Sequence, residues 1–522
     1  MTFAPTRVPG PGWLPGPGRQ GAVDRETLWY DHALGDDAPV PPPWAGRPAG
    51  DEEPVPDDLV DLVARPGKAR PWPSGLWGSA VATAFPAPAP AGPDATGSVG
   101  RASLRLAAHA VAAVRRDPDD PYNDHRAYAS PRCVFPVRAA VVTDGEWHVL
   151  DPDRRRVVPS GVDAGPAADE GTIALSGRWD AVPAGYGWFR GGLVAIETGI
   201  LLRHLAVLGR LHGLPLSVSA PGPGAGTTSA RRTWRDPARW SPPWVLTPDT
   251  AAPATGGSAV SPDLPPDPWA GASAPAAGPV LHGDDAGEDL ARVYGSHVVP
   301  GPPAALGTGL PDHPGTGDAG SWAEVLWRRS AGRMPRGLFG FRVADRAVDR
   351  GDAHALARWA LLPPPGPVAA ADAGRRVHAL VRDVPGLEPG VHEVVDGAFH
   401  PRATLPDALD RFAAAYLYGS DVMSRNDIAH APLVLVTTSR PRAAVRRAGP
   451  GGWTATHVAA GWLAHGVSLA AAARRLVARP VRALDERDVA AALDLDDDEM
   501  VGLAVVVSHH APHGGLQIDL RS

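Results

Sequence analysis

One short stretch of the chain combines positive charge with a hydroxyl group at the end of an expected helix. It runs from Trp327 to Arg333, and a helix is predicted over residues 322–329. The planar guanidinium group of arginine offers paired donors that suit phosphate oxygens, and a serine hydroxyl adds another donor. Because arginine is common in this chain, a solvated helix end is the alternative explanation for this stretch taken alone. The side chains that could contact a phosphate are Arg328, Arg329, Ser330 and Arg333.

Two further blocks with possible chemistry lie in the first half of the chain. One is the segment 126–136, which contains two arginines, a tyrosine, a serine and a phenylalanine. The other is Tyr186-Gly187, ten residues before Glu197, which lies near the start of a long apolar helix. Alone, each has a structural explanation: a turn, a packed aromatic ring, or a buried carboxylate close to a helix N-terminus.

Taken in order, the three blocks resemble motifs of the SagB-type dehydrogenases of the nitroreductase superfamily. That family carries an Arg-Arg-Ser-x-Arg phosphate motif, an Arg-x-Tyr-Pro-Ser-x-Gly-x-Leu-Tyr-Pro block and a Lys-Tyr-Gly…Glu-Ala-Gly segment that leads into a long helix. The residues that match are Arg328, Arg329 and Ser330 in the first motif; Arg126, Tyr128, Ser130, Phe135 and Pro136 in the second; and Tyr186, Gly187, Glu197 and Gly199 in the third.

The resemblance implies an FMN-dependent enzyme that oxidises thiazolines or oxazolines to thiazoles or oxazoles in a ribosomally made peptide. In such enzymes a hydride moves to the flavin while a base removes a proton, so the cofactor supplies the redox chemistry and the protein supplies orientation and the base. Tyr186 and Glu197 are the expected catalytic residues, and the expected partners are a precursor peptide and a cyclodehydratase. The residues expected to hold FMN are Arg328, Arg329, Ser330, Arg333, Arg126, Ser130 and Arg132.

The departures from the family pattern bear on this expectation. Gly185 stands where the family has a lysine before the tyrosine, and the chain has a single lysine, Lys68. A free phenol has a pKa of about 10 and needs assistance to act as a base; Glu197, Arg190 or His148 could provide it. The phosphate motif is present only in the second half and the Ser130 loop only in the first. We therefore expect one FMN per chain, held between the two halves.

The expected elements form an α+β fold. Asp144-Gly145 is a strong hairpin turn signal between strand-like residues 139–142 and 147–150. Apolar residues at helical spacing predict helices, and short apolar runs predict strands. The expected helices span residues 103–115, 192–211, 322–329, 353–361, 405–416, 456–476 and 486–493, and the later strands 377–381, 391–395, 432–437 and 501–507.

The second half repeats the order of elements of the first. Residues 144–148 resemble 390–393, and Glu197-Thr-Gly199 matches Ala459-Ala-Gly461. This suggests two nitroreductase-like halves, each an α/β/α sandwich, fused as a pseudo-dimer; two unrelated α+β domains are the alternative. The expected parts are a Pro-rich segment at 1–100, the first half at 101–220, a Pro/Gly/Ala-rich linker at 221–320 and the second half at 321–522.

Composition excludes several classes of function. The net charge is −7, and no block of basic residues predicts nucleic-acid binding. The single cysteine, Cys133, excludes an internal disulfide and a thiolate metal cluster and suits a reducing cytoplasm. Charged residues interrupt the apolar stretch 193–211, so it predicts a buried helix and no membrane span. We expect no metal site and a cytoplasmic location.

Two other functions remain open at this point. One is a nitroreductase-like NAD(P)H oxidoreductase that acts on a small molecule. The other is a flavin-free scaffold in a peptide-modifying complex, which the missing lysine favours and the retained Arg-Arg-Ser and Tyr-Gly oppose. Retention of flavin separates the enzymes from the scaffold.

Overall fold

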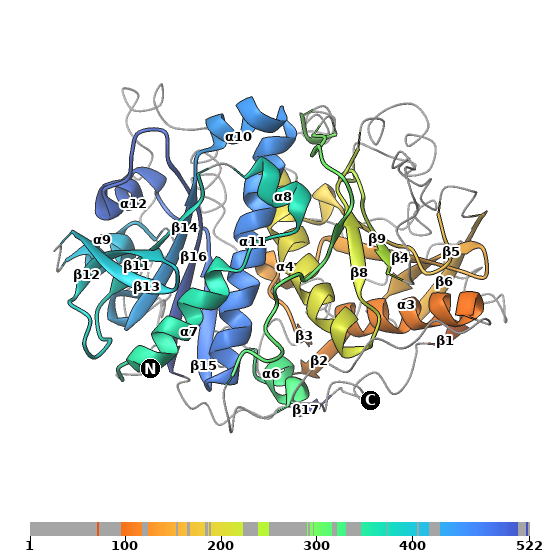
Figure 1. Cartoon of the computed structure of the whole chain (residues 1–522), viewed down its shortest axis with the longest axis horizontal. Helices are drawn as coiled ribbons and strands as arrows, with labels where there is room; N and C mark the ends of the chain where they lie inside the picture. The colour runs from red at the N-terminus through yellow and green to blue at the C-terminus, as the bar shows by residue number, and fades with distance from the viewer. Residues whose placement is uncertain are drawn as a thin grey trace, which may run out of the picture.

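The structure is a computed structural model in which two sheets flank a central pair of long helices (Figure 1). The helices are α4 (Phe189–Leu211) and α11 (Gly451–Ala473). The residues it describes are 70–71, 95–116, 124–152, 155–163, 168–182, 186, 189–222, 239–249, 290, 293–295, 297–315, 321–329, 346–372, 374–403, 407–416, 428–509 and 518–519.

The first sheet is antiparallel, with its strands in the order β1-β6-β5-β4-β7-β9-β8-β10. The turn between β4 and β5 has positive φ at both Asp144 (56°) and Gly145 (74°), as the sequence signal predicts. The strands are β1 (Arg70–Pro71), β4 (Val137–Thr143), β5 (Glu146–Asp151), β6 (Arg156–Asp163), β7 (Ile173–Gly177), β8 (Leu216–Ser219), β9 (Trp244–Pro248) and β10 (Ala304–Ala305).

The second sheet is also antiparallel, in the order β13-β12-β11-β14-β16-β15. Its central strands are apolar and buried on both faces because α11 covers one face and α9 and α12 cover the other. The strands are β11 (Arg376–Val381), β12 (Gly390–Val395), β13 (Ala398–Ala403), β14 (Leu433–Ser439), β15 (Leu476–Val481) and β16 (Met500–His509), and the two helices are α9 (Ala408–Ala414) and α12 (Glu486–Leu493).

The two sheets have the same strand order. In the first, β6-β5-β4-β7-β9-β8 are neighbours, and in the second β13-β12-β11-β14-β16-β15. Helix α4 lies between β7 and β8 along the chain, and α11 lies between the equivalent strands β14 and β15. This common order favours the expected internal duplication. The first sheet also takes β9 and β10 from the stretch 221–320, for which the sequence predicts a linker.

The central helices form the core. Almost every side chain of α4 and α11 is buried, as expected for helices that are apolar on all sides. Among the described residues α4 is the one helix long and apolar enough to cross a membrane, yet it is enclosed by α11, α3 (Ala95–Val111) and β7. It is therefore a core helix, as the sequence predicts.

Several expected boundaries are wrong. The helix predicted over 103–115 ends at Val111, because the next residues form β2 (Ala113–Arg116), which pairs with β3 (Asp124–Arg126) and β17 (Ile518–Asp519). The helix predicted to end at residue 476 ends at Ala473, because Arg475 has a φ of 57° and ends the helical backbone.

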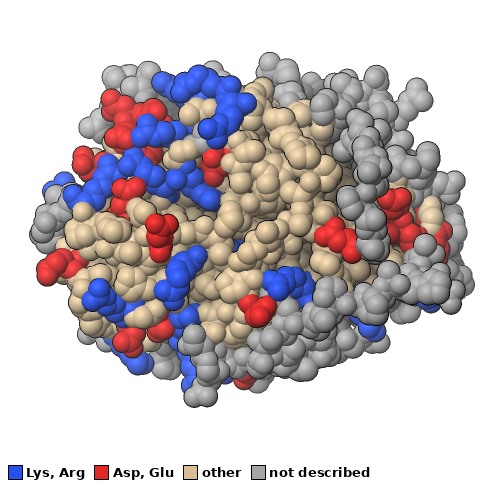
Figure 2. Space-filling view, viewed as in Figure 1, with Lys and Arg blue, Asp and Glu red and all other residues tan. Residues whose placement is uncertain are grey.

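The other helices pack around this frame. Figure 2 shows basic and acidic side chains side by side at one end of the second sheet, and several are paired there, such as Arg440 with Asp498 (2.6 Å) and Arg376 with Asp496 (2.9 Å). Opposite charges are therefore paired on part of this surface. The helices are α6 (Trp322–Arg328), α7 (Arg350–Leu361), α8 (Gly366–Ala371) and α10 (Pro441–Ala448).

Candidate functional site

The short helix α6 brings Arg329 against the loop of the first half. A capping box starts α6: the Ser321 hydroxyl accepts from the Glu324 N–H, and the Glu324 carboxylate accepts from the Ser321 N–H. Arg329 follows the last helical residue and is buried. Its Nη2 donates a hydrogen bond to the Arg126 carbonyl at 3.1 Å. The predicted phosphate motif and the predicted loop thus meet, although they are 203 residues apart in sequence.

The loop 126–136 is held by its own side chains. Nη1 of Arg126 donates to the Tyr128 hydroxyl at 3.1 Å, and the guanidinium lies 4.0 Å from the centre of the Phe135 ring. The Ser130 Oγ accepts from the Phe135 N–H at 2.8 Å, which closes the turn η3 (Pro131–Cys133). Cys133 and Phe135 have positive φ, at 55° and 48°. These contacts give the loop a defined conformation.

Glu197 lies beneath this loop on α4 and is fully buried. Its Oε1 accepts a hydrogen bond from the Val137 N–H at 3.1 Å, and the Ser130 hydroxyl also donates to its carboxylate. Burial raises the pKa of Glu197 to about 7, and it outweighs these hydrogen bonds and the positive charges of Arg126 and Arg138. Near neutral pH this carboxyl group can therefore exist with or without its proton.

Two histidines that the sequence analysis does not place in the site complete the cluster. The Tyr128 ring lies 5.8 Å from the His204 ring, and His204 Nδ1 is 3.3 Å from His465 Nε2. Burial lowers the pKa of both, that of His204 to about 3, so the rings are neutral at pH 7. The sequence carries one signal for His204, its spacing of seven residues from Glu197 on the same helix face. It carries none for the pairing with His465.

Three of the other residues that the sequence predicts for the site have described positions. Arg328 forms a partly exposed ion pair with Glu324 at 3.4 Å, as i,i+4 residues on a helix do. Tyr186 is buried just before α4. His148, on β5, places Nδ1 3.0 Å from the Glu146 carbonyl. Ser330, Arg333 and the side chain of Arg132 lie outside the described residues.

The residues that meet here suit an anionic phosphate group. The buried Arg329 guanidinium contacts the backbone of Arg126, and the positive charges of Arg126 and Arg138 both act on Glu197. Burial raises the pKa of Glu197 to about 7, so its carboxyl group is not fully ionised near neutral pH and offsets these charges only in part. Arginine donors are of the kind that bind phosphate oxygens. No group of three or more metal-ligating side chains occurs in the described part of the chain.

Comparisons with known proteins agree with this fold. The nitroreductase family model matches residues 391–508. A protein from Anabaena variabilis designated a nitroreductase superimposes with a TM-score of 0.58 at 13% identity, over 87% of this chain and 97% of its own. The likeness thus extends through both halves of the chain.

Partial matches cover about a third of the chain. The microcin synthetase complex of E. coli with truncated pro-MccB17 bound matches at a TM-score of 0.28 and 16% identity, over 34% of this chain and 70% of its own. A nitroreductase family protein of Streptococcus pneumoniae matches at 0.23 and 14%, over 36% and 92%. No curated protein shows significant sequence similarity. The nitroreductase family model thus matches part of the second half, and the chain has a nitroreductase-like fold.

Proposed function

We propose that the protein is an FMN-dependent oxidoreductase with one flavin site built from both halves. The observation that carries this proposal is the hydrogen bond from Arg329 to the carbonyl of Arg126, which joins the phosphate motif of the second half to the loop of the first. Arg329 and Arg126 hold the phosphate, with Arg328, Ser330, Arg333, Ser130 and Arg132 as the further expected contacts. When bound, FMN supplies the hydride acceptor.

The one-site stoichiometry follows from an internal duplication. The common strand order of the two sheets supports a fused pseudo-dimer, in which each half has an α4-type helix and a six-strand core. Only the second half carries Arg-Arg-Ser, and only the first carries the Ser130 loop. A site built from these two segments can therefore be complete at only one of the two equivalent positions between the halves.

Glu197 and Tyr186 are the proposed proton-handling residues. Glu197 combines complete burial with a pKa of about 7, which suits a group that takes up and releases a proton near neutral pH. Tyr186 lies just before α4, the helix that carries Glu197, and in this proposal both side chains face the flavin. In this proposal the raised pKa of Glu197 compensates for the lysine that the family has beside its tyrosine.

The more specific proposal concerns the substrate. The motif resemblance to SagB-type dehydrogenases supports oxidation of thiazolines or oxazolines in a precursor peptide. In this proposal the enzyme acts beside a cyclodehydratase in the cytoplasm. A small-molecule reductase would share the flavin site but would be reduced rapidly by NAD(P)H.

The first test is the visible absorption spectrum of the purified protein, with the released cofactor identified and counted. One FMN per chain is expected, and two per chain would contradict the composite site. Oxidation of an azoline-containing peptide with slow reduction by NAD(P)H would support the azoline dehydrogenase. The reverse pattern would favour the small-molecule reductase.

A scaffold function has one specific observation in its favour. The Ser130 hydroxyl and the Arg126 guanidinium both have partners within the protein, Phe135, Glu197 and Tyr128. A colourless protein that also fails to bind added FMN would establish that these contacts have replaced the cofactor.

A further inference from the structure

Two histidines form a hydrogen bond between the halves of the chain, next to the loop 126–136. Nε2 of His465 on α11 lies 3.3 Å from Nδ1 of His204 on α4. The two rings meet edge to face, with centroids 5.2 Å apart and 85° between their planes. Both side chains are buried. The contact therefore belongs to the interior of the junction between the halves.

The hydrogen bond requires that both imidazoles are neutral. Burial lowers the pKa of each ring, and the positive charge of Arg329 lowers both further. A neutral imidazole has one N–H and one nitrogen lone pair, so one ring donates and the other accepts. The pairing with His465 thus sets the orientation of the His204 ring.

His204 continues this contact to the loop through Tyr128. The Tyr128 ring lies 5.8 Å from the His204 ring and 5.4 Å from the Phe135 ring. The Tyr128 hydroxyl accepts from Nη1 of Arg126 at 3.1 Å, and the Arg126 guanidinium lies 4.0 Å from the centre of the Phe135 ring. A continuous series of contacts therefore runs from α11 to both ends of the loop. It is separate from the hydrogen bond that Arg329 donates to the Arg126 carbonyl.

The equivalent position on the other central helix has a different residue and different contacts. His465 is four residues after Gly461, and Arg203 is four residues after Gly199, the glycine that matches Gly461. Arg203 is also buried, and it donates to backbone carbonyls of α11 and α7 at 3.0 Å each. These hydrogen bonds join helices and do not involve the loop. Arg203 is therefore a matched comparison for His465.

We propose that His465 is a positioning residue of the flavin site, which holds the loop 126–136 in place from the second half through His204 and Tyr128. The consequence for flavin binding rests on the proposed function, whereas the contact series to the loop does not. In this proposal the second half fixes the loop at two points, Arg329 and His465.

Cys133 provides a readout of the loop that needs no flavin. It is the only cysteine in the chain, it lies within the loop, and it is 8% exposed. A chromogenic thiol reagent in native buffer therefore reacts with it at a rate set by local opening of the loop.

His465→Met removes the hydrogen bond and keeps an apolar side chain of similar volume. Loss of one buried neutral hydrogen bond changes an equilibrium constant roughly 2- to 10-fold. We expect Cys133 to be labelled faster by a factor in this range, and the dissociation constant of FMN to rise by a similar factor. His465→Gln should restore both values in large part, because its amide group can donate or accept at the position of Nε2.

Two further variants separate this role from general destabilisation. Arg203→Met should lower the stability against denaturant but leave both the labelling rate of Cys133 and the affinity for FMN unchanged. Tyr128→Phe keeps the ring and breaks the series at its next step, the hydroxyl that accepts from Arg126. It should accelerate labelling, and it tests the series even where His465→Met does not fold.

The proposal is wrong if His465→Met and Tyr128→Phe are labelled at the wild-type rate, if His465→Gln behaves as His465→Met does, or if Arg203→Met accelerates labelling equally. Faster labelling of His465→Met with unchanged affinity for FMN would overturn the role of His465 in flavin binding. A wild type that binds no FMN would contradict the proposed function, and the labelling rates alone would then support or refute the link from His465 to the loop.

Discussion

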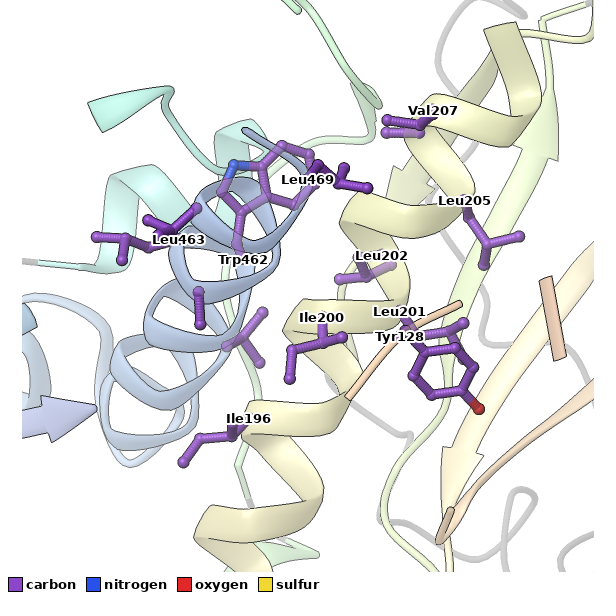
Figure 3. Close-up of a cluster of buried hydrophobic side chains, with 14 of the residues drawn as sticks. Tyr128, Ile196, Ile200, Leu201, Leu202, Leu205, Val207, Trp462, Leu463 and Leu469 are labelled. Carbon is purple, nitrogen blue, oxygen red and sulfur yellow. The ribbon is translucent and has the colours of Figure 1, made fainter. Parts of the chain in front are cut away.

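Gly199 and Gly461 each lie against the backbone of the opposite helix where α4 and α11 pack together. A Cβ atom on Gly199 would lie 1.9 Å from the Val458 carbonyl oxygen, and one on Gly461 would lie 1.9 Å from the Ile196 carbonyl oxygen. Val458 is three residues before Gly461, and Ile196 is three residues before Gly199, so the contact is reciprocal. Figure 3 shows Ile196 and Trp462 among the apolar side chains at this contact. The helix pair therefore has approximate twofold symmetry, as two fused halves would.

Gly199→Ala should destabilise the protein because the added methyl group has no space at this contact. Overpacking of this kind costs about 1–3 kcal/mol in the free energy of unfolding, and more where backbone must move. Chemical denaturation followed by circular dichroism measures it, and Gly461→Ala should have a similar effect because of the reciprocal geometry.

Gly351→Ala is the matched control for this prediction. Gly351 lies in α7, where a Cβ atom would meet nothing within 4 Å. Gly351 is the second residue of α7, so alanine should be tolerated there and should stabilise the helix by at most about 0.5–1 kcal/mol. Tight packing of α4 on α11 would be refuted if Gly199→Ala were as well tolerated as Gly351→Ala.

Glu197 should make stability depend on pH. Its pKa is raised from 4.5 to about 7 in the folded state, so the folded protein binds this proton more tightly than the unfolded chain. The protonated form is the one that favours folding, and stability should fall as pH rises from 4.5 to 7. The loss through this group should reach about 3 kcal/mol.

Glu197→Gln keeps the shape of the side chain and removes the titration. Its free energy of unfolding should lack this component of the pH dependence between 4.5 and 7. The stability of the variant relative to that of the wild type should therefore increase as pH rises. Chemical denaturation at several pH values compares the two proteins. Parallel curves would show that Glu197 does not carry the shifted pKa.

Local signals predict much of the fold. Asp144-Gly145 specifies a turn with two positive φ values, and the structure has both. Helices α4 and α11 are apolar on all sides and not on one face only, which indicates complete burial. Helix ends are less predictable, because competing pairing sets them: residues 113–116 satisfy helical spacing but join β3 in a sheet.

The site is only partly predictable, and for a physical reason. The motif resemblance predicts that Arg329 and the loop at Arg126 act together, and the hydrogen bond between them is found. The contact between His204 and His465 joins residues 261 apart and depends on how two helices pack. No local pattern encodes such a contact.

Tyr186→Phe tests the proposed proton transfer without removing a buried ring. The variant should fold and keep its flavin, since Tyr186 packs in the core and phenylalanine has nearly the same volume. Loss of a general acid or base slows turnover by about 10²–10⁴-fold. Azoline oxidation at saturating peptide measures this, and an undiminished rate would remove Tyr186 from the mechanism.

Arg329 and Arg328 are adjacent in sequence but differ in environment, which makes them a matched pair for the flavin site. Arg329 is buried against the loop of the first half, whereas Arg328 is paired with Glu324 on α6. A charge-assisted hydrogen bond to phosphate contributes about 1.5–3 kcal/mol, so Arg329→Ala should raise the dissociation constant of FMN roughly 10- to 100-fold. Arg328→Ala should change it less, because its present partner lies on its own helix.

A fluorescence titration of the flavin-free proteins measures both constants. Equal effects would mean that burial does not decide which arginine holds the phosphate, and no effect in either variant would move the flavin site away from α6.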